Sequence, residues 1–247
     1  MSRWKAAGLH LLISIAVGIV TGALIYFVWY PPPYFEVAGG STLMLVIMGV
    51  DITIGPFLTL AVFKAGKKSL RFDLTVIALL QIAAFCYGIH AIALARPVFV
   101  VAEVDRYVLV TANQLDDADL ADAKRPEFRT RAWTGPRLVG ARPPEHGRET
   151  LDMVESALAG KDIDRFPRYY VAYDEVSREL LERGITLRAL AEKSADAATL
   201  VKNFLDAYGG KAEDYRCLPL VGRIDNFTMV VSDTTRRPVT ALRIAFW

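Results

Sequence analysis

The chain is poor in the residues that build disulfide frameworks and metal sites. Its 247 residues include only two cysteines and three histidines. Cys86 lies in an apolar run and Cys217 in the polar half of the chain, so we expect no disulfide between them. The cysteines and histidines also lack the spacing of metal ligands. The sequence therefore predicts neither a disulfide-stapled fold nor a metal site.

Motifs of the common catalytic machineries are missing as well. The chain contains no GxSxG, P-loop, HExxH or GxGxxG pattern. His146, in a proline-rich stretch, is the single histidine of the polar half and the single candidate base for a hydrolase triad. No basic motif accompanies Cys217, which favours a buried structural thiol over a nucleophile. We expect a protein that is not an enzyme and uses no cofactor.

Charge is scarce in the first part of the chain and abundant in the second. Residues 1–95 carry six Lys/Arg and three Asp/Glu, whereas residues 96–247 carry 23 and 24. The polar part is almost neutral, which argues against nucleic-acid binding. Three apolar runs, 7–29, 41–63 and 74–95, have 22 or 23 residues each, and about 20 suffice to cross a bilayer. The sequence predicts a three-helix transmembrane region followed by one separate domain.

The distribution of positive charge predicts the direction of the spans. The basic residues of the first part stand before the first run and in the loop after the second: Arg3, Lys5, Lys64, Lys67, Lys68 and Arg71. The other loop, 30–40, has no Lys or Arg. The positive-inside rule then places the N-terminus in the cytoplasm and the domain across the membrane. In a bacterium this means an inner-membrane protein with a periplasmic domain.

The polar part has the pattern of an α+β domain. Strand-like segments rich in Val, Tyr and Phe cover 98–104, 106–111, 215–221, 227–232 and 239–246. Because these segments come from both ends of the domain, we expect a mainly antiparallel sheet with helices from the middle of the sequence.

Helices and a loop-rich stretch are expected between the strands. Apolar residues at helical spacing and end signals such as Gly209 predict helices over 149–159, 174–182, 187–193 and 195–208. Prolines punctuate the segment before the first of these helices, and there we expect loops.

Asp51 is the one acidic residue deep inside a predicted span. It lies about ten residues from the outer end, or about 15 Å at 1.5 Å per residue. A charge there costs about 2.5–3.5 kcal/mol on insertion scales. One interpretation is that Asp51 contacts a partner helix or a transported ion. The other is an internal polar network with Gln81, Tyr87 and His90 of the third span.

A second candidate contact lies in the first span. Ser14, Gly18 and Gly22 recur every four residues and end in a GxxxG match, which allows close approach of another helix. His10 extends the same face. The stripe either packs against the other two spans or receives a helix from a partner protein, and GxxxG alone does not decide between them.

Six stretches together resemble the TfpX/TfpZ family of type IV pilin accessory proteins of Gram-negative bacteria. They are RWKAAGLHLLIS (3–14), WYPPPYFEVAGG (29–40), GVDITIGPFLTLAVFKAGKK (49–68), FDLTVIALLQIAAFCYGIH (72–90), ARPVFVVAEVD (95–105) and YRCLPLVG (215–222). The resemblance implies an inner-membrane protein, encoded near a pilin, that helps this pilin reach or enter the pilus used in twitching motility. It implies no reaction, no cofactor and no assigned binding residues.

The resemblance also sets the expected partners. They are the major pilin of the type IV pilus, the pilus assembly machinery and membrane lipids, with no nucleic acid. We expect a chaperone that supports the stability or assembly of its pilin by noncovalent contacts, with Ser14, Gly18, Gly22 and Asp51 as candidate contacts for the pilin helix. The alternatives are a pilin-modifying membrane enzyme and a membrane-anchored periplasmic sensor. Three spans argue against the enzyme, and a short cytoplasmic part argues against the sensor.

Overall fold

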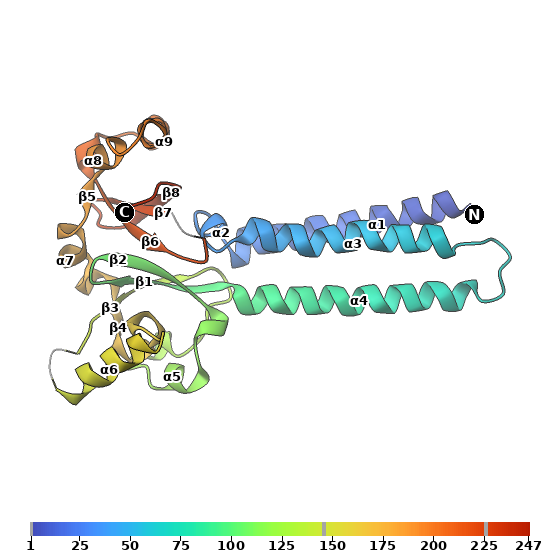
Figure 1. Cartoon of the computed structure of the whole chain (residues 1–247), viewed down its shortest axis with the longest axis horizontal. Helices are drawn as coiled ribbons and strands as arrows, with labels where there is room; N and C mark the ends of the chain where they lie inside the picture. Colours follow the sequence, from blue (N-terminus) through green and yellow to red (C-terminus); the bar gives the residue numbers. More distant parts are fainter. Residues whose placement is uncertain (1, 145–146, 225–226) are drawn as a thin grey trace.

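Three long apolar helices form a bundle with an α+β domain at one end (Figure 1). The computed structural model describes residues 2–144, 147–224 and 227–247. The bundle helices are α1 (Arg3–Leu24, extended by a π-helical turn over Ile25–Trp29), α3 (Gly40–Val62) and α4 (Leu70–Ala95). Each is long and apolar enough to cross a membrane. The N-terminus and the α3–α4 connection lie at the end of the bundle away from the domain.

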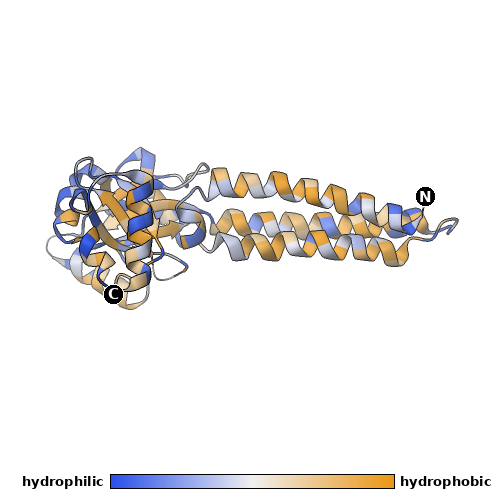
Figure 2. Ribbon diagram, turned by 90° about the horizontal axis from the view of Figure 1, so that it is seen from above, coloured by the Kyte–Doolittle hydropathy of each residue, from blue (hydrophilic) through white to orange (hydrophobic). Residues whose placement is uncertain are grey.

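The bundle helices begin and end as their sequences dictate. The Ser2 side chain accepts a hydrogen bond from the Lys5 backbone N–H at 3.3 Å and caps α1. Gly39, with φ of 71°, reverses the chain before α3. Pro56 lies inside α3, which continues through it to Val62. Apolar residues run along all three helices, whereas hydrophilic residues cover much of the domain (Figure 2).

The domain is built on an eight-stranded mixed sheet in the described part of the chain. The strand order is β4-β3-β1-β2-β6-β7-β8, and β5 pairs with β6. Pairs β1/β3 and β2/β6 are parallel and the others antiparallel. The strands are β1 (Pro97–Glu103), β2 (Arg106–Thr111), β3 (Arg137–Ala141), β4 (Tyr170–Ala172), β5 (Ile185–Thr186), β6 (Tyr215–Val221), β7 (Phe227–Ser232) and β8 (Pro238–Leu242). The predicted fold class is confirmed.

The helices of the domain cover the sheet in separate groups. They are α5 (Asp117–Ala121), α6 (Arg148–Leu158), α7 (Ser177–Glu182), α8 (Leu187–Ala191) and α9 (Ala195–Tyr208). Side chains of α7 join the core on one face of β1, and α5 joins the core on the other face. Helices α8 and α9 form a third cluster with β6 and β7. The strand alternation of β1 explains this division, because Val100 and Val101 point to opposite faces.

Three elements differ from the sequence predictions. Strand β3 lies in the proline-rich stretch where we expected loops, because it is a short strand that pairs in parallel with the distant β1. The last strand ends at Leu242 rather than Phe246. The helix expected from residue 174 begins at Ser177, after a 3-10 turn over Tyr173–Glu175. All three differences lie in short segments, where tertiary pairing overrides local pattern.

Helix α6 is present as predicted, but its apolar stripe does not pack. Leu151, Val154 and Leu158 are at least half exposed, and no residue of α6 is buried. The 3.6-residue period therefore identified the helix correctly without telling which surface it covers.

The connection between α1 and α3 is buried in the domain. Tyr30 and Val37 are fully buried and belong to the same core cluster as β1 and β6. The Tyr30 hydroxyl donates to the carbonyl oxygen of Ile92 in α4 at 2.9 Å. The backbone N–H of Ile224 donates to the carbonyl oxygen of Val37 at 3.0 Å. The bundle and the domain consequently share one hydrophobic core.

Arg96 fixes the point where α4 leaves the bundle. It is 5% exposed and its Nε donates to the carbonyl oxygen of Ala132 at 3.0 Å. Its guanidinium also donates to the carbonyl oxygen of Ala93 and lies 3.9 Å from the ring centre of Trp133. Cation–π stacking and these hydrogen bonds satisfy the buried charge. Strand β1 therefore starts in a fixed direction from the end of α4.

Gly135 tests the contact between the domain and the α1–α3 connection. Its φ is 78°, and a Cβ there would lie 2.8 Å from Cγ of Pro31. We predict that Gly135→Ala lowers the free energy of unfolding by more than the about 1–2 kcal/mol that a left-handed backbone costs. Gly160→Ala is the control, because Gly160 also has a positive φ, 89°, and nothing lies within 4 Å of its Cβ position. Thermal unfolding in detergent measures both, and equal losses would contradict the Pro31 contact.

Candidate functional site: a groove within the helix bundle

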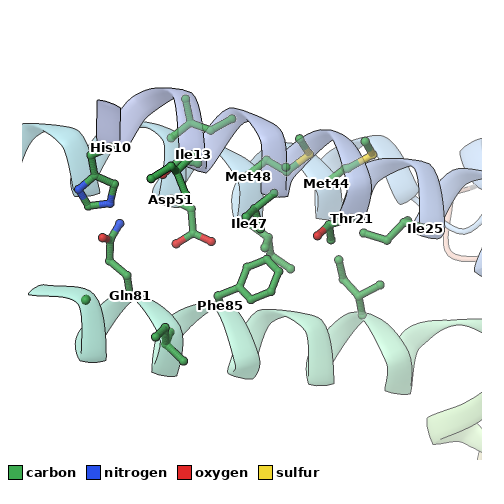
Figure 3. A pocket seen from close by; sticks show the side chains of 17 residues that line it. His10, Ile13, Thr21, Ile25, Met44, Ile47, Met48, Asp51, Gln81 and Phe85 are labelled. Carbon is green, nitrogen blue, oxygen red and sulfur yellow. The ribbon is translucent and has the colours of Figure 1, made fainter. Parts of the chain in front are cut away.

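A cavity of about 360 Å³ opens between α1, α3 and α4 (Figure 3). We call this cavity the membrane groove. Its walls are mostly apolar and include Ile13, Met48 and Phe85, one from each helix. Its polar lining residues are His10, Ser14, Thr21, Asp51 and Gln81. The polar side chains of three apolar helices thus converge on one space.

The groove exists because α3 packs against both other helices while α4 stays apart from α1. Gly18 and Gly22 bring α1 close to α3, since a Cβ at these positions would lie 2.9 Å from Cε of Met48 and 2.5 Å from Cε of Met44. On the other side, Gly88 of α4 faces Ile47 of α3. Figure 3 shows the open space between α1 and α4.

The polar residues in the groove differ in their partners. Nδ1 of His10 and the hydroxyl of Thr59 lie 2.6 Å apart and form a hydrogen bond between α1 and α3. The amide of Gln81 packs directly on Gly55, where a Cβ would clash with it. Asp51 points from α3 toward α4, between Gln81 and Phe85 (Figure 3). Within the described residues, its carboxyl group forms no hydrogen bond to another side chain or to the backbone.

The predicted small-residue stripe lies between α1 and α3. Ser14 and Gly18 line the groove, and Gly18 and Gly22 face the methionines of α3. The glycines therefore allow the close packing of α1 within the chain itself. Contact of the stripe with a partner helix remains a prediction.

The third span does not bring its polar residues together. Gln81 lines the groove, whereas Tyr87 is 76% exposed and His90 is exposed on the outer side of α4. Residues two apart on a helix point in nearly opposite directions, so Tyr87 cannot share the face of Phe85. Counting residues from the helix end gave the depth of these side chains but not their direction. A polar network that joins all of them remains a prediction.

Two features of the groove escaped the sequence analysis. Thr59 was not identified as the partner of His10, and Phe85 was not identified as a lining residue. The helical spacing of Ala78, Gln81, Phe85 and Ile92 was a usable signal for the inner face of α4. This signal was hard to see because most other residues of α4 are apolar too.

A leucine at Gly22 tests the close packing of α1 on α3. We predict that Gly22→Leu forces the helices apart and lowers the stability of the bundle by about 1–3 kcal/mol, the usual cost of overpacking. Gly8→Leu on the same helix is the control, because nothing lies within 4 Å of its Cβ position. Thermal unfolding in detergent compares the two variants. Equal midpoints would show that Gly22 does not set the helix separation.

A buried acidic pair in the domain is a second candidate site. Glu103 at the end of β1 and Asp164 are 8% and 6% exposed. Burial, with the nearby carboxylates of Asp164 and Asp162, raises the pKa of Glu103 from 4.5 to about 8. Burial also raises the pKa of Asp164. One oxygen of Glu103 has no hydrogen-bond partner among the described residues, and a missing partner disfavours the charged form of the carboxyl group.

The acidic pair predicts how stability depends on pH. The pKa of Glu103 is higher in the folded state than in the unfolded state, so the folded state binds more protons between pH 4.5 and about 8. We predict that the free energy of unfolding falls as pH rises through this window, by up to about 1.4 kcal/mol per unit of pKa difference. Glu103→Gln should flatten the pH dependence of the unfolding midpoint. Glu192→Gln, at an exposed site, should leave it unchanged, and an unchanged slope in Glu103→Gln would contradict the assignment.

The Cys217 thiol is buried in the third core cluster of the domain. Burial raises the pKa of the Cys217 thiol to about 12, which makes it a poor nucleophile. In the parts of the chain that the structure covers, no three His, Cys, Asp or Glu side chains group as metal ligands. His146, the candidate base, lies outside the described residues.

The fold and the groove define a membrane protein whose apolar helices and α+β domain form one unit. The chain belongs to the family of fimbrial assembly proteins. It is 33% identical to the fimbrial assembly protein of serogroup I from Dichelobacter nodosus over 243 residues, which cover 97% of this chain and 94% of that protein. The serogroup E1 protein of the same organism is 32% identical over the same length and the same shares of both chains.

Further comparisons agree with this family. The protein of serogroups C1 and C2 is 42% identical over 113 residues, which cover 45% of this chain and 86% of that protein. The family model for fimbrial assembly protein FimB matches residues 1–39. No solved structure matches the chain.

Proposed function

We propose that this protein is an inner-membrane accessory protein of type IV pili that supports the stability or assembly of its cognate pilin by noncovalent contacts. The names of its relatives support a role in fimbrial assembly. The resemblance to the TfpX/TfpZ family supports the finer assignment to pilin. We infer that the partners are the major pilin, the pilus assembly machinery and the surrounding lipids.

The observation that carries the proposal is the shared core of the bundle and the domain. A fimbrial subunit that waits in the membrane as a helix with a globular head presents two surfaces at a fixed separation. A partner for both surfaces needs a membrane part and an external part held rigidly together. The burial of Tyr30 and Val37 under the sheet provides this connection.

The distribution of charge supports an orientation with the domain in the periplasm. The basic residues near the N-terminus and in the α3–α4 connection lie together at the end of the bundle away from the domain (Figure 1). The positive-inside rule favours the cytoplasm for that end. The domain then lies on the side where a fimbrial subunit carries its head.

Deletion of the gene tests the proposed function. We predict that the deletion strain loses most surface fimbriae and twitching motility and contains less pilin in its inner membrane, while pilin transcript is unchanged. The wild-type gene supplied in trans should restore all three. Immunoblots of membrane fractions and electron microscopy measure the outcome. Unchanged pilin and fimbriae would refute the proposal.

The same strains separate a noncovalent role from enzymatic modification of pilin. The intact mass of the remaining pilin should be identical with and without this protein, because noncovalent support leaves no chemical mark. Mass spectrometry of purified pilin measures this. A mass difference that complementation reverses would favour a pilin-modifying enzyme instead.

A further inference from the structure

We propose that the membrane groove receives the membrane helix of the fimbrial subunit, and that this helix presents a hydrogen-bond donor to Asp51. The inference rests on the proposed function for the identity of the partner. It specifies the surface that binds, the face of each helix that takes part and the polar contact that selects the partner.

Asp51 lies at a depth where an unpaired polar group is costly. It is in the middle of α3 (Gly40–Val62), about 17 Å from either end at 1.5 Å per residue. An unpaired carboxyl group at this depth is costly, and intramembrane acids usually face a polar partner or cavity. The Asp51 side chain points into the groove and has no hydrogen bond to another described residue (Figure 3). None of the described residues supplies this partner in the structure, which leaves the carboxyl group open to a donor that enters the groove.

The polar side chains around Asp51 form no hydrogen bond to its carboxyl group in the described part of the chain. His10 is hydrogen-bonded to Thr59, and the Gln81 side chain packs on Gly55. Gln81 extends from α4 toward the same space as Asp51 without bonding to it (Figure 3). A hydroxyl, amide or amine that enters between α1 and α4 would reach Asp51.

The size of the groove limits what can enter it. A cavity of about 150 Å³ holds one benzene, so about 360 Å³ takes two groups of that size. A helix is about 10 Å across and does not fit as a whole. A ridge of side chains from one helix face does fit, while the rest of that helix remains in lipid. The groove thus has room for about two side chains from one face of a helix.

The chemistry of the lining selects among the groups that could enter the groove. Asp51 is the one acidic lining residue, and no Lys or Arg lines the groove in the described residues. A partner carboxylate at the same depth would repel Asp51, whereas a donor or an amine would be attracted. A lipid acyl chain fills apolar space but leaves the carboxyl unsatisfied. The groove therefore favours an apolar helix that carries one donor near its middle.

Photocrosslinking in cells tests the inference with two positions on α4. We replace Phe85, which lines the groove, or Tyr87, which faces outward and is 76% exposed, with p-benzoylphenylalanine. The two probes lie two residues apart at nearly the same depth. We expect a covalent adduct with the fimbrial subunit from position 85 and little from position 87. Peptide mapping should place the crosslink in the apolar helix of the subunit.

Variants of Asp51 test the polar contact. Asp51→Leu removes the hydrogen bond and also removes a costly charge, so the protein should still insert. We expect it to reduce the position-85 adduct by about three- to twentyfold, the range that measured intramembrane hydrogen bonds correspond to. Asp51→Asn keeps an acceptor oxygen and should retain most of the adduct. An unchanged adduct in Asp51→Leu would overturn the role of Asp51.

Other outcomes overturn the groove as the binding surface. They are adducts with lipid alone at position 85, adducts with a second copy of this chain, and equal subunit adducts from positions 85 and 87. These results leave the proposed function intact if the wild-type gene still restores fimbriae to the deletion strain. Conversely, a deletion strain with normal pilin and fimbriae refutes the function itself, whatever the crosslinks show.

Discussion

The arrangement of the molecule depends on the burial of the α1–α3 connection in the core of the domain. Tyr30 and Val37 are part of the same cluster as β1 and β6, and Tyr30 also bonds to the end of α4. Burial of these side chains away from water stabilises the packing of three helix ends against one sheet. Arg96 completes the junction through its stacking on Trp133. The domain therefore packs directly on the end of the bundle and is not joined to it by a linker alone.

The packed junction also affects how the bundle helices contact one another. Because α4 is held at its end by Tyr30 and Arg96, it need not pack along its whole length against α1. Close approach is concentrated between α1 and α3, where glycines face methionines. The space left over is the membrane groove, into which Asp51 points. The attachment of α4 at its end thus accounts for both the junction with the domain and the open groove.

Much of the fold could be predicted because its strongest signals are local. Apolar runs of spanning length mark the three bundle helices, and alternating or helical patterns mark β2, β6 and α9. Strand β3 was missed, because a short strand among prolines is stabilised by its parallel pairing with β1 rather than by its own residues. The groove was predictable only in part. Asp51 could be identified from its charge within an apolar span. The sequence did not indicate that Phe85 lines the groove or that Tyr87 points outward.

The sequence by itself determined the three apolar helices, the α+β class of the polar part and the polar residues within the spans. Those properties follow from hydrophobicity and periodicity, which each segment carries alone. The tertiary structure decided which helix faces meet: it directed Gly18 toward Met48 and left Asp51 open toward α4. In an apolar helix every face suits lipid, so composition does not indicate the packed side. Only the contacts between helices, fixed by the buried junction, select it.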